Sequence, residues 1–424
     1  MADTVKNQNP MPIFRNTKYR AQSARGLTYQ GSGAISVLPE ICAAEGWSKL
    51  FLVIDPGVLE NGVADGIIKV IKDAGLAYTI YSKIEPNPLQ EDIEKIGIPM
   101  CREFDADVVV GIGGGSGMDS AKGVVMVGKT DMNIKEATEK LRAMNPYVDP
   151  PWYTYPMIAI PTTCGTGSEV IRNSVISEPD GHKMVTTHDC ILPRYAICDP
   201  DLLASLPSHV AAATAMDALV QAIESYVSRA ATTLSEMCGL KAVELMAPVM
   251  VAYVRNPADK EAADRISKGC IFGGYSWNGA VPCQIHGCNH PITEVLHISH
   301  GDACAILLPW FVEWNGENAK EKFWRVHNAM YPLAQVDFKD FSICEFVEKL
   351  KVFNYELNIM NNMTMDEYVK WRGNPEGCSG ETCDKIIDMQ FRGGSFSHPR
   401  RTSIAEMKAA LRDVNHGKYI YKPE

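Results

Sequence analysis

The pattern of hydrophobic and polar positions changes once along the chain, near Pro207. Before that residue, short apolar runs alternate with stretches of helical periodicity, such as the one over about residues 63–74. This alternation is typical of a parallel sheet with helices on both faces, whose ligands bind at the carboxyl ends of the strands. The apolar runs predict five buried strands, at residues 50–55, 77–82, 107–112, 157–161 and 195–200.

After Pro207 the apolar residues recur at helical spacing. A stretch rich in Asn, Gly, Cys and Thr at residues 361–382 is expected to be a long surface loop. The chain is therefore predicted to hold an α/β domain over residues 1–206 and an all-α domain over residues 207–424. Helices are expected around residues 209–229, 234–254, 260–280, 317–333, 343–353 and 403–413.

Composition and charge narrow the class of protein. A chain of 424 residues is long enough for two domains with proper cores. The net charge of −10, without a Lys- or Arg-rich run, argues against a nucleic-acid surface. We expect no signal peptide and no bilayer span, because the most apolar helical stretch is interrupted by Lys241 and Glu244. The 13 cysteines form no CxxC pair and are expected to be reduced thiols in a cytoplasmic protein.

Two loops in the first half suggest a phosphate-binding site. The glycines and serine at 113–116 follow a predicted strand and precede a helix, so free N–H groups and the helix dipole can attract a pyrophosphate. PTTCGTGSE, at 161–169, follows another strand, and two such loops at one sheet edge favour a dinucleotide. Asp55 ends the first strand, where a carboxylate would accept from an adenosine ribose and repel a 2′-phosphate, which favours NAD over NADP. The alternative interpretation of Asp55 is a helix cap or turn former.

The second half contains candidate metal ligands. Four of the ten histidines fall within 15 residues, among them His286 and His300, which a helix break at Pro291 is expected to separate. With Asp217 they form a carboxylate-and-imidazole set suited to a divalent cation. Gln221 lies four residues after Asp217, on the same helix face. The alternatives are a buried hydrogen-bonded pair and ordinary core histidines, but the clustering favours the metal.

Five successive motifs resemble those of the iron-dependent (group III) alcohol dehydrogenases. They are GGGSGMDSAK, PTTCGTGSE, KMVTTHDCILPRYAICDPDLLASLP, AMDALVQAIESYVS and HGCNHPITEVLHISHG, within about residues 25–415. The resemblance implies a Rossmann-like N-terminal domain and a helical metal-binding C-terminal domain with the active site in the cleft between them. It also implies hydride transfer between NAD(P) and a small alcohol or aldehyde, aided by a divalent metal (Fe²⁺ or Zn²⁺, with Mn²⁺ as a further option), in a homo-oligomer.

The resemblance assigns roles residue by residue. His290 matches a histidine that relays protons, and Asp217, His286 and His300 match metal ligands. The family's fourth ligand is a histidine, whereas this chain has Gln221, a weaker neutral donor. The implied substrate contacts are Asn173, Trp277, Arg392, Gly394 and His398. The implied cofactor contacts are Asp55, Asn87, Gly113, Gly114, Gly115, Ser116, Thr162, Thr163, Thr166 and Lys183.

The substrate is the least determined feature. In FRGGSFSHPRR, near the C-terminus, glycine and serine N–H groups with a nearby arginine could hold an anion. That would suit an aldehyde with an anionic tail, such as sulfoacetaldehyde, since the family includes sulfoacetaldehyde reductases. The alternative is a plain glycine-rich turn and a short-chain alcohol or diol as substrate.

Three other functions remain open from the sequence. One is a lyase resembling dehydroquinate synthase, which would need a basic cluster for a phosphorylated sugar acid. Another is a non-catalytic NAD-binding protein whose site has decayed at Gln221. The third is a metal-free reductase resembling the maleylacetate reductases.

Overall fold

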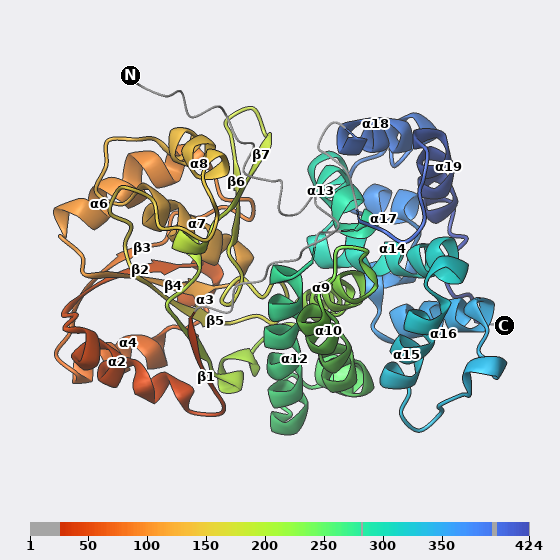
Figure 1. Ribbon diagram of the computed structural model, residues 1–424, viewed down its shortest axis with the longest axis horizontal. Helices are drawn as coiled ribbons and strands as arrows, with labels where there is room; N and C mark the ends of the chain where they lie inside the picture. The colour runs from red at the N-terminus through yellow and green to blue at the C-terminus, as the bar shows by residue number, and fades with distance from the viewer. Residues whose placement is uncertain (1–25, 281–282, 392–396, 424) are drawn as a thin grey trace, which may run out of the picture. The chain divides into compact units, whose positions relative to one another are not determined.

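The computed structural model describes residues 26–280, 283–391 and 397–423 of the chain. These form two compact units, labelled unit 1 and unit 2 here (Figure 1). Unit 1 holds the chain up to residue 162 and residues 168–202, and unit 2 holds residues 163–167 and everything after residue 202.

Unit 1 is built on a six-stranded sheet in which every pairing is parallel, in the order β1-β8-β5-β4-β2-β3. The expected α/β class is confirmed. A separate antiparallel hairpin, β6–β7, was not predicted, and neither was β1. The strands are β1 Leu27–Gln30, β2 Lys49–Ile54, β3 Ala77–Tyr81, β4 Val108–Gly113, β5 Met157–Pro161, β6 Asn173–Ser177, β7 Lys183–Thr187 and β8 Tyr195–Cys198.

Helices cover both faces of this sheet because its strands are apolar on both sides. Leu50 and Leu52 of β2 pack with α2 and α4, whereas Phe51 and Val53 pack with α6, α7 and α8 on the opposite face (Figure 1). The helices of unit 1 are α2 Leu38–Glu45, α3 Pro56–Glu60, α4 Asp65–Asp73, α5 Gln90–Asp92, α6 Ile98–Glu103, α7 Gly115–Val127 and α8 Ile134–Ala143, with short helical turns η1 Ala34–Val37, η2 Ile93–Gly97, η3 Asp189–Ile191 and η4 Pro200–Leu203.

A buried lysine ties α7 to the segment that leads into the β6–β7 hairpin. Lys122 is fully buried, and its Nζ donates to the carbonyl oxygens of Ser168, Ile171 and Asn173 at 2.7–2.9 Å and to the Ser168 hydroxyl at 2.7 Å. Burial lowers the pKa of Lys122, while the charges of Asp119 and Glu169 act in the opposite direction. The lysine therefore fixes a loop by satisfying carbonyls that no strand or helix pairs.

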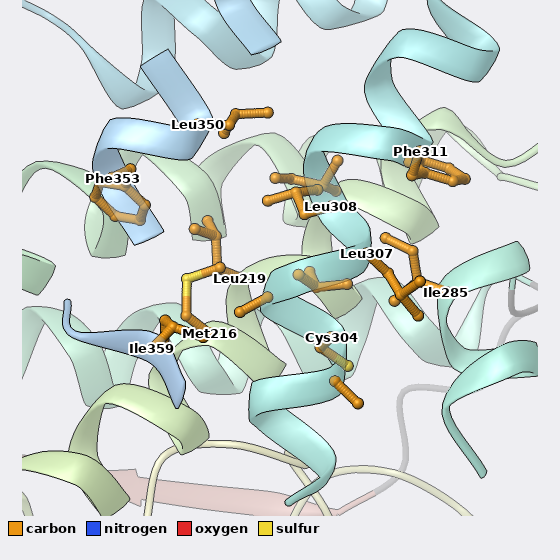
Figure 2. Close-up of a cluster of buried hydrophobic side chains, with 14 of the residues drawn as sticks. Met216, Leu219, Ile285, Cys304, Leu307, Leu308, Phe311, Leu350, Phe353 and Ile359 are labelled. Atoms are coloured by element: carbon orange, nitrogen blue, oxygen red, sulfur yellow. The ribbon is translucent and has the colours of Figure 1, made fainter. Parts of the chain in front are cut away.

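All the regular secondary structure of unit 2 in the described residues is helical. Its core is a single apolar cluster, and Figure 2 shows the part in which Met216 and Leu219 of α9 face Leu308 of α14 and Phe353 of α16. The helices are α9 Ser208–Val227, α10 Thr233–Met246, α11 Met250–Arg255, α12 Lys260–Asn278, α13 Gln284–Leu296, α14 His300–Asn315, α15 Lys320–Met330, α16 Ile343–Glu356, α17 Met365–Trp371, α18 Gly380–Phe391 and α19 Ile404–Asn415, with turns η5 Ala247–Val249, η6 Gly316–Asn318, η7 Phe338–Asp340 and η8 Ile359–Asn362.

One segment of unit 2, Thr233–Arg255, is long and apolar enough to cross a membrane by length and composition. Half of its most apolar window is buried inside the unit. A single segment of this kind is weak evidence, because the core helix of a globular unit meets the same test.

Two expectations for the second half were wrong. The loop expected at 361–382 contains α17 and the start of α18, because Thr364 and Glu367 form a capping box that starts a helix with a buried face. The break expected at Pro291 does not occur, and α13 runs through this proline to Leu296. The helix ends at His297, which adopts a left-handed φ of 53°.

Candidate functional site

The glycine turn of unit 1 lies between β4 and α7. Gly113 has a φ of 146°, and a Cβ added to it would lie 2.1 Å from Oδ2 of Asp55. Asp55 follows β2, the neighbour of β4 in the sheet, and its Oδ2 accepts from the Gly114 N–H at 2.6 Å. Glycine is therefore needed at 113 both for the backbone conformation and for the approach of the carboxylate.

The role of Asp55 in cofactor choice stays a prediction. Burial raises the pKa of Asp55, and hydrogen bonds from the Gly114 and Gly117 N–H groups act against that rise. The contacts that the structure shows are with the N–H groups at the start of α7, whereas Asp55 makes no side-chain cap hydrogen bond to α3, which it precedes, and it remains partly exposed.

Several other predicted cofactor contacts of unit 1 lie at the same sheet edge. The Ser116 hydroxyl donates to the Pro86 carbonyl at 2.7 Å, which holds the turn that carries Asn87 against α7. The Thr162 N–H, just after β5, donates to the Gly113 carbonyl at 3.0 Å. The Thr162 side chain is 2% exposed, and its hydroxyl has no hydrogen-bond partner among the described residues. A buried hydroxyl beside a glycine turn fits a polar ligand group at this edge.

The remaining cofactor and substrate candidates of the first half lie elsewhere. Lys183 begins β7, and Asn173 begins β6 at the opposite end of the hairpin. Thr163 and Thr166 belong to the five-residue loop that is part of unit 2.

The candidate metal ligands of unit 2 converge on one carboxylate oxygen. Nε2 of His286 and Nε2 of His300 each lie 3.4 Å from Oδ1 of Asp217. Asp217 and His286 are buried, and His300 is about one-third exposed. Burial would raise the pKa of Asp217, but the charges and hydrogen bonds of His300 and His286 outweigh it and keep the pKa well below its ordinary value.

A second carboxylate, Glu224, orients one of these imidazoles. It is fully buried, its Oε2 lies 2.5 Å from Nδ1 of His286, and it accepts from the backbone N–H groups of Ile285 and His286. Burial works against protonation of His286, yet hydrogen bonds with Asp217 and Glu224 raise its pKa to about 9. Two buried carboxylates thus favour a positive charge between them, which fits a cation held by the ring. Glu224 was not predicted from the sequence, although it lies seven residues after Asp217 on the same helix face.

Gln221 lies beside this cluster. It is 3% exposed, and its Nε2 has no hydrogen-bond partner among the described residues. The loop of residues 163–167 packs closely there, since a Cβ added to Gly165 would lie 3.3 Å from Oδ2 of Asp217 and one added to Gly167 would lie 3.4 Å from Nε2 of Gln221. Amide oxygen and nitrogen exchange places on a 180° rotation, so a cation donor is available at this position.

Two further predicted residues, Trp277 and His290, pack beside the candidate metal ligands, and a third, His398, is described by its pKa. The Trp277 ring packs against that of His286 with centroids 4.8 Å apart, and the His290 ring lies 5.6 Å from that of His300. Burial, followed by the charge of Arg229, lowers the pKa of His398 to about 4. Arg392 and Gly394 lie outside the described residues.

Comparison with known proteins identifies the family. Residues 27–200 match the iron-containing alcohol dehydrogenase family, and residues 211–413 match the C-terminal domain of the same family. This chain belongs to the iron-containing alcohol dehydrogenases. It is therefore an NAD-dependent, metal-containing oxidoreductase acting on alcohols or aldehydes.

Several relatives show the range of this family. The chain is 32% identical over 298 residues to the lactaldehyde reductase of Escherichia coli, covering 69% of this chain and 75% of that protein. It is 31% identical over 322 residues to the choline dehydrogenase of Bacillus subtilis, covering 75% and 78%. A solved 1,3-propanediol oxidoreductase has a TM-score of 0.83 at 25% identity, covering 94% of this chain and 100% of that one. The sulfoacetaldehyde reductase of Bifidobacterium kashiwanohense in complex with NAD⁺ shares the fold at 22% identity, with a TM-score of 0.80 and coverage of 93% and 98%.

Proposed function

We propose that this protein interconverts a small primary alcohol and its aldehyde with NAD(H), and that Asp217, His286, His300 and Gln221 hold its divalent metal. The supporting observation is the approach of two imidazole Nε2 atoms to the same Asp217 oxygen, each at 3.4 Å. A metal-free reductase would have no need for this buried charge arrangement.

The side chains of unit 2 prepare the site for the cation. Glu224 accepts a hydrogen bond from Nδ1 of His286, which leaves Nε2, 3.4 Å from Oδ1 of Asp217, as the ring atom that would hold the cation once it has lost its proton. Asp217 stays ionised under ordinary conditions because its pKa is lowered. When bound, the metal supplies a Lewis acid for the oxygen of the alcohol or aldehyde.

The proton of the alcohol needs a route to solvent. His290 lies one helical turn after His286 on α13, and its ring is 5.6 Å from that of His300. We assign to it the relay of this proton, because an imidazole gains and loses a proton near neutral pH.

The nicotinamide cofactor is assigned to unit 1. The N–H groups at the start of α7 and the buried Thr162 hydroxyl suit its phosphates, and the cofactor carries the hydride. We propose NAD rather than NADP because the Asp55 carboxylate at this edge would repel a 2′-phosphate.

Metal analysis tests the proposed function. We expect about one divalent metal per chain, loss of activity on chelation and loss of metal retention in Asp217→Ala and His300→Ala. Asp302→Ala, which removes another carboxylate of α14 that caps with Ser299, serves as the control. Full activity of a preparation shown by elemental analysis to be metal-free would contradict the proposal.

Kinetics with the two cofactors test the role of Asp55. The wild type is expected to prefer NADH, and Asp55→Ser should narrow the preference by removing the repulsion of the 2′-phosphate. A wild type that uses NADPH as efficiently as NADH would overturn this assignment.

We further propose, at finer detail, that the substrate is an aldehyde with an anionic tail. The charge of Arg229 acts on His398, a predicted substrate contact, so this residue lies in a positive potential that would favour an anionic group. Loss of a charge-assisted contact costs about 1.5–3 kcal/mol, so Arg392→Ala should lower efficiency on sulfoacetaldehyde by roughly 10- to 150-fold and leave propanal almost unchanged. Equal losses on both, or a wild type that prefers propanal, would return the substrate to a plain short-chain alcohol.

A further inference from the structure

We propose that the thiolate of Cys304 is a further ligand of this metal, so that the centre of this chain contains sulfur. The inference rests on the proposed function, because it needs a cation at Asp217, His286 and His300. Cys304 follows His300 by four residues on α14, so both side chains lie on one helix face.

The distances suit a shared cation. One ligand atom from each of Asp217, His286, His300 and Cys304 lies within 4.8 Å of the others, and the Cys304 Sγ is 3.9 Å from Oδ1 of Asp217. Tetrahedral ligands with bonds of about 2.0–2.3 Å lie roughly 3.3–3.8 Å apart. The Asp217–imidazole distances of 3.4 Å fall in that range, and the distance of 3.9 Å between the Cys304 Sγ and Oδ1 of Asp217 lies just above it.

A neighbouring amide donates a hydrogen bond to this sulfur. Nδ2 of Asn289, which is fully buried on α13, donates to the Cys304 Sγ at 2.8 Å and to the His300 carbonyl at 2.7 Å. The Asn289 Oδ1 in turn accepts from Thr293 Oγ1 at 3.0 Å, which fixes the orientation of the amide. N–H donors to a sulfur ligand are a common outer contact at metal centres.

Gln221 is an independent sign that this place takes a ligand. Its buried amide lies on α9 one turn after Asp217 and lacks a partner among the described residues. In a cluster that served only to pack the core, a buried amide would be hydrogen-bonded or would be replaced by an apolar side chain. Figure 2 shows Cys304 on α14, with Leu307, Leu308 and Phe311 of the apolar core further along the same helix.

The chemistry of the donors indicates which metal they favour. The thiolate and the Asp217 carboxylate, as the two anionic ligands, match the charge of a divalent cation, and the buried Glu224 carboxylate behind His286 adds a further negative charge. Thiolate sulfur is a soft ligand that suits Zn²⁺ better than Mn²⁺ or Mg²⁺. Replacing this sulfur by a hydroxyl should therefore weaken Zn²⁺ binding by about 10- to 100-fold or more, by analogy with losses at supporting residues of metal sites.

Cobalt substitution tests the proposal without relying on activity. The wild type, Cys304→Ser, Asp217→Ala and the control Cys238→Ser, which removes a buried thiol of α10, are loaded with Co²⁺. The wild type and Cys238→Ser should show the near-ultraviolet charge-transfer absorption of a thiolate–cobalt bond. Cys304→Ser should retain Co²⁺ but lose that absorption, and Asp217→Ala should retain none.

Two results would overturn the proposal, and they differ in what they leave standing. Wild-type protein that binds one Co²⁺ without the thiolate absorption would refute Cys304 as a ligand and keep the metal site. Wild-type protein that binds neither Co²⁺ nor Zn²⁺ would refute the metal site itself. X-ray absorption of the Zn²⁺-loaded wild type decides even if Cys304→Ser does not fold: one sulfur at about 2.3 Å supports the ligand, and only nitrogen and oxygen at about 2.0–2.1 Å refutes it.

Discussion

Gln221 and Glu224 show how much a single side chain on α9 can decide at the metal centre. Both lie on the helix face that carries Asp217, one and two turns further along. Gln221 offers a neutral, weak ligand atom in a buried position, whereas Glu224 sets the orientation of His286. The two residues therefore affect metal affinity by different routes, and each can be tested separately.

Gln221→His should tighten metal binding, because imidazole is a stronger donor than an amide oxygen. The measurement is competition for Zn²⁺ with a chelator of known affinity. Gln335→His, which adds an imidazole at an exposed position, is the control and should leave the affinity unchanged. Unchanged or weaker affinity in Gln221→His would show that this side chain does not reach the metal.

Glu224→Gln should weaken metal binding by about 10- to 100-fold, the usual range for loss of a supporting carboxylate. An amide of the same shape can no longer hold His286 through a charged hydrogen bond, so the Nε2 lone pair is less well directed. The same competition assay measures the effect. Glu244→Gln, at an exposed pair with Lys241, should have none, and equal affinities in both variants would remove Glu224 from the metal's support.

At the scale of elements, the strands that were predicted are those with continuous apolar runs. β2, β4 and β5 are buried along almost their whole length, which gives an unmistakable hydrophobic pattern. β1 has no buried position, and β6 and β7 alternate buried with partly exposed positions over only five residues each, so none of the three has the continuous apolar run on which the prediction of strands relied. In α17 the capping pair Thr364 and Glu367 was readable but was outweighed by the composition of the surrounding segment.

At the site, the residues that were predicted are those that form an unusual cluster in the sequence. Asp217, His286 and His300 stand out because carboxylate and imidazole side chains cluster there. Glu224 lies in the helix that was predicted around Asp217 and on the same face, but a single glutamate there gave no signal of its own. Cys304 becomes visible only when the phase of α14 is known, because it lies four residues after His300. With the break placed at Pro291, the start of α14 at His300 was not fixed, and the phase of Cys304 could not be used.

Lys122 connects two elements of unit 1, because its side chain joins α7 to the segment before β6. Lys122→Met should lower the unfolding free energy of unit 1 by about 3–5 kcal/mol, the usual effect of breaking a buried charge network. The substitution leaves three carbonyl groups without their hydrogen-bond donor, and it removes the positive charge near the carboxylates of Asp119 and Glu169. Urea denaturation followed by circular dichroism measures the loss.

Lys129→Met is the control for that experiment. Its ammonium pairs with Asp105 at the surface just after α7, where an exposed pair contributes at most about 1 kcal/mol. Equal loss in the two variants would mean that Lys122 acts only as a packed side chain.

At the scale of the whole molecule, metal binding should also be a stability effect. Three helices, α9, α13 and α14, supply the proposed ligands, so a bound cation opposes their separation. Zn²⁺ at 100 times its dissociation constant should add about 2.7 kcal/mol to the stability of unit 2. In calorimetry, Zn²⁺ should raise the unfolding temperature of the wild type and should not change that of Asp217→Ala. An equal rise in both proteins would point to binding elsewhere.

The loop of residues 163–167 gives the chain an unusual genetic property. It belongs to unit 2, although the residues on either side belong to unit 1, so the polypeptide passes between the units three times. Its glycines lie directly behind Asp217 and Gln221. A recombination event that exchanged everything after residue 202 would replace the helices that carry the ligands but keep the original loop of residues 163–167 beside them. The two units therefore cannot be exchanged independently, and a working metal centre requires residues 163–167 and the chain after residue 202 to change together.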